Sequence, residues 1–220
     1  MTRIINPVRF NGDHGEVDWG VDGLHARPEL AVQIPIMLSL SSTVELSIAR
    51  VFGHCLEGAP EGIATGIYVL LEDRSNWNMQ RDVLIEIARS RLTPQLHGRL
   101  THFLNTEYPP LRNERNKLAH ALWFACRSNP DILLRSAPRT EMEQQGARFG
   151  IPFGGGMSSN HQHDQWARRM EVYDLNLFMQ LRKAFDLAVL KAEQLKFRAA
   201  GVDPWADGLD QQIAEREARP

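Results

Sequence analysis

Apolar side chains recur every three or four residues along most of this chain, and this spacing is typical of helices with one buried face. The longest such stripe runs from Trp166 to Leu195 and requires a long partner surface, either within the chain or on another subunit. No strand–helix alternation, glycine-rich dinucleotide motif or phosphate-binding loop interrupts the pattern. The helices that the spacing predicts cover residues 36–56, 61–72, a segment around 83–88, 94–104, 110–127 and 164–200.

Prolines and small polar residues indicate where these helices begin and end. Thr93 followed by Pro94 predicts a capped helix start, because proline is favoured at the first helical position. The pair Pro109–Pro110 predicts a break, since the residue before each proline is disfavoured in the helical conformation. A new helix is therefore expected to run from about Pro110 to Arg127.

Three segments lack the helical spacing. Residues 1–25 carry scattered glycines and charges, and we interpret them as an arm or a loosely docked pair of strands. Residues 128–163 alternate turn residues with short β-compatible pieces, which indicates a loop-rich, partly β-like insertion. Residues 201–220 form a polar tail with Trp205 as its one anchor. The sequence thus predicts an all-α helical bundle over residues 26–200 that contains this insertion.

The composition is that of a soluble globular protein. Of 220 residues, 43% are hydrophobic and 24% are charged, which excludes a wholly disordered chain. The net charge of -2 excludes a protein that coats nucleic acid or membranes by bulk charge. Neither an apolar signal region nor a membrane-spanning apolar run is apparent, so we expect a cytoplasmic protein with no membrane contact. Cys55 and Cys126 are too few for a disulfide framework and are expected in the core.

The densest group of reactive side chains lies in the run L-R-N-E-R-N-K-L-A-H-A-L-W, which begins at Leu111. Its candidate site residues are Arg112, Arg115, Asn116, Lys117 and His120. Arg112, Asn116 and His120 follow one another at intervals of four, so they would form one polar stripe on a helix. Guanidinium groups match phosphate oxygens, the amides of a helix start add partial positive charge, and imidazole exchanges protons near neutral pH. The pattern indicates phosphate binding, with Arg112 and Lys117 as binding residues.

The segment R-N-K-L-A-H-A-L-W, which starts at Arg115, resembles the Arg-polar-x-x-x-His signature of HEPN-domain proteins. It is most similar to the branch of that superfamily that carries R-N-x-x-A-H-G-x-W. The motif resemblance is confined to this run. Elsewhere the resemblance rests on architecture: helices before the motif, an irregular stretch after it and a long closing helix.

The resemblance implies a HEPN-like helical bundle in which the motif lies at the start of a late helix. It also implies RNA cleavage without a metal ion or other cofactor, at the interface of a homodimer, by attack of the 2′-hydroxyl on the adjacent phosphate. His120 would be the general acid or base, Arg115 would stabilise charge on the phosphate oxygens, and Asn116 would orient the histidine or bind the RNA backbone. A toxin or defence effector, controlled by an antitoxin or another regulatory protein, is the role it suggests.

Arg115 and His120 are five residues apart, which is about 140° around a regular helix, so within one subunit they do not face a single point. A symmetric dimer resolves this difficulty, because groups from two subunits can converge. The residues also leave a second interpretation open. In it, a non-catalytic module dimerises through the 164–200 helix and binds nucleotide, RNA or an acidic protein partner through Arg112, Arg115 and Lys117.

Overall fold

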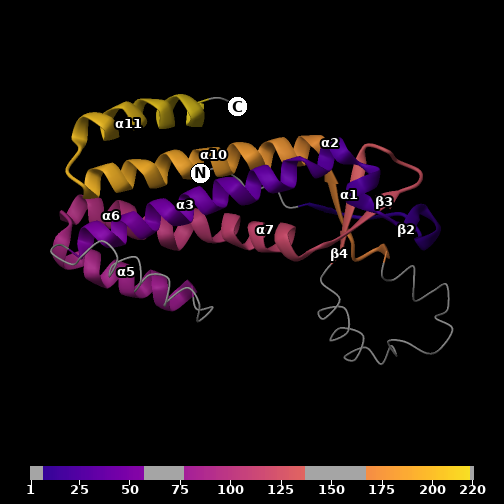
Figure 1. The fold of residues 1–220 in the computed structure, drawn as a ribbon, viewed down its shortest axis with the longest axis horizontal. Helices are drawn as coiled ribbons and strands as arrows, with labels where there is room; N and C mark the ends of the chain where they lie inside the picture. The colour runs from indigo at the N-terminus through magenta and orange to yellow at the C-terminus, as the bar shows by residue number, and fades with distance from the viewer. Residues whose placement is uncertain (1–6, 57–76, 137–166, 219–220) are drawn as a thin grey trace. The chain divides into compact units, whose positions relative to one another are not determined.

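The computed structural model describes residues 7–56, 77–136 and 167–218 (Figure 1). The chain divides into two compact units. Unit 1 comprises Met1–Thr2, Ser39–Asn113 and Ala184–Pro220, and unit 2 comprises Arg3–Leu38 and Glu114–Lys183. The predicted helical class is confirmed, although the helices are accompanied by a small antiparallel sheet. The helix expected over 61–72 lies outside the described residues.

Unit 1 is helical in its described part. It contains α5 (Trp77–Arg91), α6 (Pro94–His102), the π-helical turn η2 (Phe103–Glu107), α11 (Asp203–Ala218) and parts of α3 (Gln33–Cys55), α7 (Tyr108–His120) and α10 (Leu175–Ala199). The predicted helix cap is confirmed, because Thr93 Oγ1 accepts a hydrogen bond from the Leu96 amide at 3.3 Å and Pro94 opens α6. The apolar positions of α3 that recur at helical spacing in this unit are buried: Val44, Ile48, Val51 and Cys55. Burial raises the pKa of the Cys55 thiol to about 11.

Unit 2 contains the sheet. Its strands are β1 (Val8–Arg9), β2 (Val17–Asp22), β3 (Leu122–Cys126), β4 (Ile132–Ser136) and β5 (Glu171–Asp174). They pair antiparallel in the order β1-β5-β4-β3-β2. Short helical turns η1 (His14–Glu16), α1 (Gly23–Ala26) and α2 (Pro28–Ala31) flank β2, and the remaining parts of α3, α7 and α10 complete the unit.

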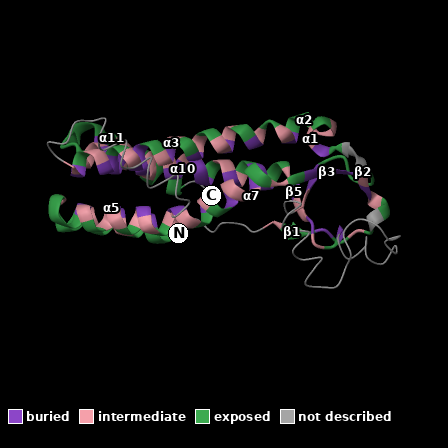
Figure 2. Cartoon of the chain, turned by 60° about the horizontal axis from the view of Figure 1, so that its bottom comes forward, coloured by how far each residue is buried: buried purple, intermediate pink, exposed green. Residues whose placement is uncertain are grey.

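Both faces of this sheet are covered, as the burial colouring of Figure 2 shows for β3. Because side chains alternate along a strand, Ile132 and Leu134 lie on one face and Leu133 on the other. The first face packs in an apolar cluster with Val17, Cys126 and other buried residues. The second face carries Tyr173, whose ring meets Trp123 edge-on at 5.2 Å between ring centroids. The sheet is therefore a two-sided core of unit 2.

Two helices are shorter than the sequence predicts. The helix expected over 110–127 ends at His120, and the helix expected over 164–200 begins at Leu175. Strands β3 and β5 take the places of the missing turns. The physical reason is pairing: both segments have a partner on each side in the sheet, which offsets their helical spacing. Asp174 then starts α10, since its Oδ1 accepts a hydrogen bond from the Leu177 amide at 2.7 Å.

The break expected at Pro109–Pro110 is wrong. Tyr108 opens α7, and both prolines lie in its first turn, where the fixed φ of proline is compatible with the helix. The preceding turn, Phe103–Glu107, is π-helical and joins α6 directly to α7. The prolines therefore mark a helix start within a continuous helical stretch.

The segments that lack helical spacing have mixed outcomes. Part of residues 1–25 forms β1 and β2, in line with the strand alternative. Within the predicted insertion, Ile132–Ser136 is strand β4, and residues 137–163 lie outside the described part. The segment treated as a tail contains a helix, α11, from Asp203 to Ala218.

One stretch, Pro28–Cys55, is long and apolar enough to cross a membrane if only length and composition are considered. Core helices of soluble proteins have the same properties. Residues of this stretch in both units, including Met37, Val44 and Ile48, are almost fully buried.

Two glycines provide a test of this packing. A Cβ atom at Gly23 would lie 2.5 Å from the backbone carbonyl carbon of Phe124, so the backbone would have to shift, although β3 is hydrogen-bonded to a strand on each side. Gly23→Ala should therefore lower the free energy of unfolding by about 1–3 kcal/mol in urea denaturation. Gly98→Ala in α6 is the matched control, because nothing lies within 4 Å of its Cβ position, and it should stabilise by up to about 1 kcal/mol. Equal stability of the two variants would contradict this packing.

Candidate functional site

The Arg-Asn-x-x-x-His motif lies in the last turns of α7, with His120 as the final helical residue. The expected position at a helix start is therefore wrong. The end of a helix presents carbonyl oxygens, which carry partial negative charge, so the amides of α7 do not contribute to phosphate binding beside His120. Any positive charge at this end of α7 comes from side chains.

His120 and Arg115 have no carboxylate partner within the described residues. The His120 side chain is exposed to solvent and forms no hydrogen bond or ion pair with the described part of the chain. Arg115 is half-buried, and its buried Nε has no hydrogen-bond partner. The His120 ring thus retains hydrogen-bonding capacity for a ligand, whereas the unpartnered Nε of Arg115 is buried.

Asn116 holds the arginine rather than the histidine. Arg115 Nη1 donates a hydrogen bond to Asn116 Oδ1 at 3.0 Å. The structure thus brings the Arg115 and Asn116 side chains together, and among the described residues no side-chain hydrogen bond joins either of them to His120. Of the two roles that the sequence suggests for Asn116, orienting His120 is not supported within this subunit.

The two predicted binding residues have carboxylates nearby, although the buried Nε of Arg112, like that of Arg115, has no hydrogen-bond partner. In unit 2, Lys117 Nζ lies 3.2 Å from Glu114 Oε2 and 4.0 Å from Glu171 Oε1. In unit 1, Arg112 Nε lies 3.9 Å from Glu45 Oε1, and its guanidinium lies 4.9 Å from the centroid of the Trp77 ring. These partners neutralise part of the local positive charge.

Glu114 fixes the last turns of α7 against the sheet. It is only 4% exposed, and it accepts a hydrogen bond from the Tyr173 hydroxyl on β5 in addition to its ion pair with Lys117. On the same face of the sheet, Arg135 Nε donates to Glu171 Oε2 at 2.8 Å. Burial and the adjacent Glu114 charge raise the pKa of Tyr173, so this hydroxyl remains a donor.

Sequence reasoning missed Glu114 and Tyr173. One signal was present, because Leu111, Glu114 and Leu118 are spaced by three and four, which places Glu114 in the middle of the apolar stripe of α7. A charged residue in such a stripe requires a buried donor. Nothing in the sequence identifies that donor as Tyr173, which lies 59 positions away.

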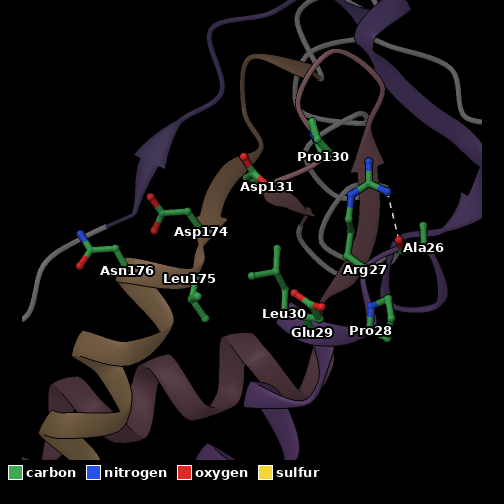
Figure 3. A pocket seen from close by; sticks show the side chains of 10 residues that line it. All are labelled: Ala26, Arg27, Pro28, Glu29, Leu30, Pro130, Asp131, Asp174, Leu175 and Asn176. Atoms are coloured by element: carbon green, nitrogen blue, oxygen red, sulfur yellow. Dashed lines mark hydrogen bonds between the residues drawn. The ribbon is translucent and has the colours of Figure 1, made fainter.

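A cavity of about 470 Å³ lies elsewhere in unit 2, beyond the other end of β3 (Figure 3). Arg27 lines it and donates from Nη2 to the Cys126 carbonyl at 3.0 Å. Its other ionisable lining residues are acidic: Glu29, Asp131 and Asp174. Three carboxylates against one guanidinium do not suit a phosphate, and no predicted site residue lines the cavity.

No protein-family model, curated protein or solved structure matches this chain. Among the described residues, no group of three or more His, Cys, Asp or Glu side chains is arranged to hold a metal ion. The candidate site therefore rests on its own residues: Arg115, Asn116 and His120, supported by Glu114 and Tyr173.

The Tyr173–Glu114 hydrogen bond can be tested by its dependence on pH. Tyr173→Phe should lower the free energy of unfolding at pH 7 by about 1–3 kcal/mol, because Glu114 loses a buried donor. Since the folded pKa is raised, the contribution of Tyr173 is fully present below its unfolded pKa of 10.0 and is lost as the pH rises further. The stability difference between wild type and variant should therefore shrink above about pH 10. A difference that stays constant in urea titrations across that range would contradict the assignment.

Proposed function

We propose that this chain is a metal-independent endoribonuclease of the HEPN type that acts as a cytoplasmic homodimer. One observation carries the proposal. Of the four basic motif residues, Arg112 and Lys117 have carboxylate neighbours, whereas the two to which the proposal assigns the chemistry, Arg115 and His120, have none among the described residues. An unpaired guanidinium and an exposed imidazole are suited to a phosphodiester that carries its own nucleophile.

The proposed reaction breaks one P–O bond of RNA. The 2′-hydroxyl oxygen attacks the adjacent phosphorus, and the 5′-oxygen of the next nucleotide leaves. His120 accepts the 2′-hydroxyl proton or donates a proton to the leaving oxygen, and Arg115 stabilises the negative charge that develops on the non-bridging oxygens. Asn116 keeps the guanidinium in place through its hydrogen bond. The products are a 2′,3′-cyclic phosphate and a 5′-hydroxyl end.

The helix geometry favours a site shared between two copies of the chain. Arg115 and His120 project about 140° apart and are separated by about 7.5 Å along the axis of α7. Opposing α7 ends from two copies would bring the arginine of one to the histidine of the other. The substrate then binds between copies, which agrees with the exposure of His120.

The alternative, a module that only binds phosphates, has less support. It relies on Arg112, Arg115 and Lys117 acting as one basic patch. Glu45 and Glu171, together with Glu114, offset the charges of Arg112 and Lys117, which leaves Arg115 as the cation without a carboxylate. A single half-buried guanidinium gives weak binding but is sufficient to stabilise a transition state.

The decisive variant is His120→Ala. It should lower cleavage of total RNA at least about 100-fold, because proton transfer is lost, while circular dichroism and thermal unfolding stay unchanged. Wild-type products should end in a 2′,3′-cyclic phosphate, and EDTA should not alter the rate. His54→Ala is the matched control, since His54 is also exposed and lies at a helix end in unit 1.

The arginines give a second, paired comparison. Arg115→Ala should reduce cleavage much more than Arg112→Ala, because Arg112 is held by Glu45 and Trp77. Full cleavage by His120→Ala would exclude this function. RNA binding by wild type without any cleavage would favour the module.

Mixing two inactive variants tests the shared site. In a dimer of one His120→Ala chain and one Arg115→Ala chain, one of the two composite sites has both groups and the other has neither. The mixture should therefore regain cleavage that neither variant shows alone. Failure to regain activity in dimers shown to have exchanged subunits would place each site within a single chain.

A further inference from the structure

Helix α11 lies along the second part of α10 in unit 1 and is held there mainly by polar contacts (Figure 1). Lys191 Nζ lies 2.8 Å from Glu217 Oε1 at one end of α11. Near the other end, Arg198 pairs with Asp203, Asp207 and Asp210, and Gln194 donates to Asp210. Among the described residues of α11, only Ala206 is buried. Ion pairs therefore join α11 to α10, while the apolar side chains of α11 other than Ala206 are not buried.

An open groove of about 500 Å³ lies between the two helices, and we call it the α10–α11 groove. Its lining residues are Glu193, Phe197, Pro204, Trp205, Gly208, Leu209 and Gln212. Trp205 stacks on Phe197 with ring centroids 5.9 Å apart, yet it is 68% exposed. A large aromatic side chain held in place by a neighbour but open to solvent is typical of an anchor in protein–protein contacts.

Gly208 lines the groove, and the position that a Cβ atom would occupy there is in open space. Nothing lies within 4 Å of that position. Glycine is unfavourable in the interior of a helix relative to alanine. Internal packing therefore does not require a small residue at this position.

The negative charge around the groove favours a positively charged ligand. Helix α11 carries five carboxylates and one arginine, which is an excess of four negative charges. Arg198 of α10 pairs with three of these carboxylates, and Lys191 pairs with a fourth but is shared with Glu107. On the α10 side of the groove, Glu193 is paired with Lys196, whose Nζ lies 4.2 Å from the centroid of the Phe197 ring. Two of the residues paired with Arg198, Asp203 and Asp207, are about two-thirds exposed. A cationic side chain beside the groove would relieve their mutual repulsion, whereas RNA and anionic lipid would be repelled.

We propose that the α10–α11 groove is a docking site for a basic peptide segment of a partner protein. One large apolar side chain of that segment enters between Trp205, Phe197 and Leu209, and a neighbouring lysine or arginine contacts Asp203 and Asp207. The site is separate from Arg115 and His120, so it does not depend on the proposed ribonuclease activity. A partner protein that binds the α10–α11 groove could recruit this chain or regulate it.

The test is binding of a short fluorescein-labelled peptide of lysine, alanine and one central phenylalanine to the full chain, followed by fluorescence anisotropy. Wild type should bind it, with affinity that falls as salt rises. Trp205→Ala and Gly208→Leu should each weaken binding at least about tenfold, the first by removing the anchor wall and the second by filling the groove. Leucine is a strong helix former, so Gly208→Leu should leave α11 intact in circular dichroism.

Matched controls separate this site from general charge attraction. Leu46→Ala removes an exposed apolar side chain elsewhere in unit 1 and should not change binding. The double variant Asp203→Asn, Asp207→Asn should weaken binding and flatten its salt dependence, whereas Asp82→Asn on α5 should not. The proposal is overturned if Trp205→Ala and Gly208→Leu bind like wild type, or if a peptide with alanine in place of phenylalanine binds equally well.

Discussion

The buried carboxylate of Glu114 is the constraint on which the candidate site depends. A charge at 4% exposure is tolerated only with donors, and Tyr173 and Lys117 supply them from the sheet and from the next turn of the helix. Because Glu114 faces inward, the rotation of α7 about its own axis is determined, and Arg115, about 100° further round, lies at the edge of the buried face. His120 then ends the helix in solvent. Losing the carboxylate contacts would therefore disturb the site without touching its reactive groups.

Ion pairs with carboxylates distinguish Arg112 and Lys117 from Arg115 within the motif. The sequence shows an excess of positive charge around Arg115, but Glu45 and Glu171 come from distant parts of the chain to meet Arg112 and Lys117. Local charge counts thus overstate the basic character of this helix. What remains is a small reactive set, which is better suited to catalysis at one phosphate than to binding an extended strand.

The same chain carries an acidic helix, α11, whose carboxylates pair with Lys191 and Arg198 among the described residues. The net charge of the whole chain is only -2, but the charges are unevenly distributed. The end of α7 in unit 2 carries basic side chains, and α11 in unit 1 is acidic. Such segregation is compatible with the two proposed ligands of opposite charge, a phosphodiester and a basic peptide, because each would be repelled from the other's site.

The sequence by itself determined the helical class, the course of α3, the capped start of α6 and the presence of an Arg-Asn-x-x-x-His run, because periodicity and capping are local properties. It did not determine where α7 and α10 end, since β3 and β5 are stabilised by pairing with strands from other parts of the chain, such as Val17 opposite Cys126. Nor did it show that Glu114 meets Tyr173, or that Arg112 and Lys117 are neutralised. Those features were decided by tertiary structure, because a buried charge and its partner are brought together only when distant segments pack.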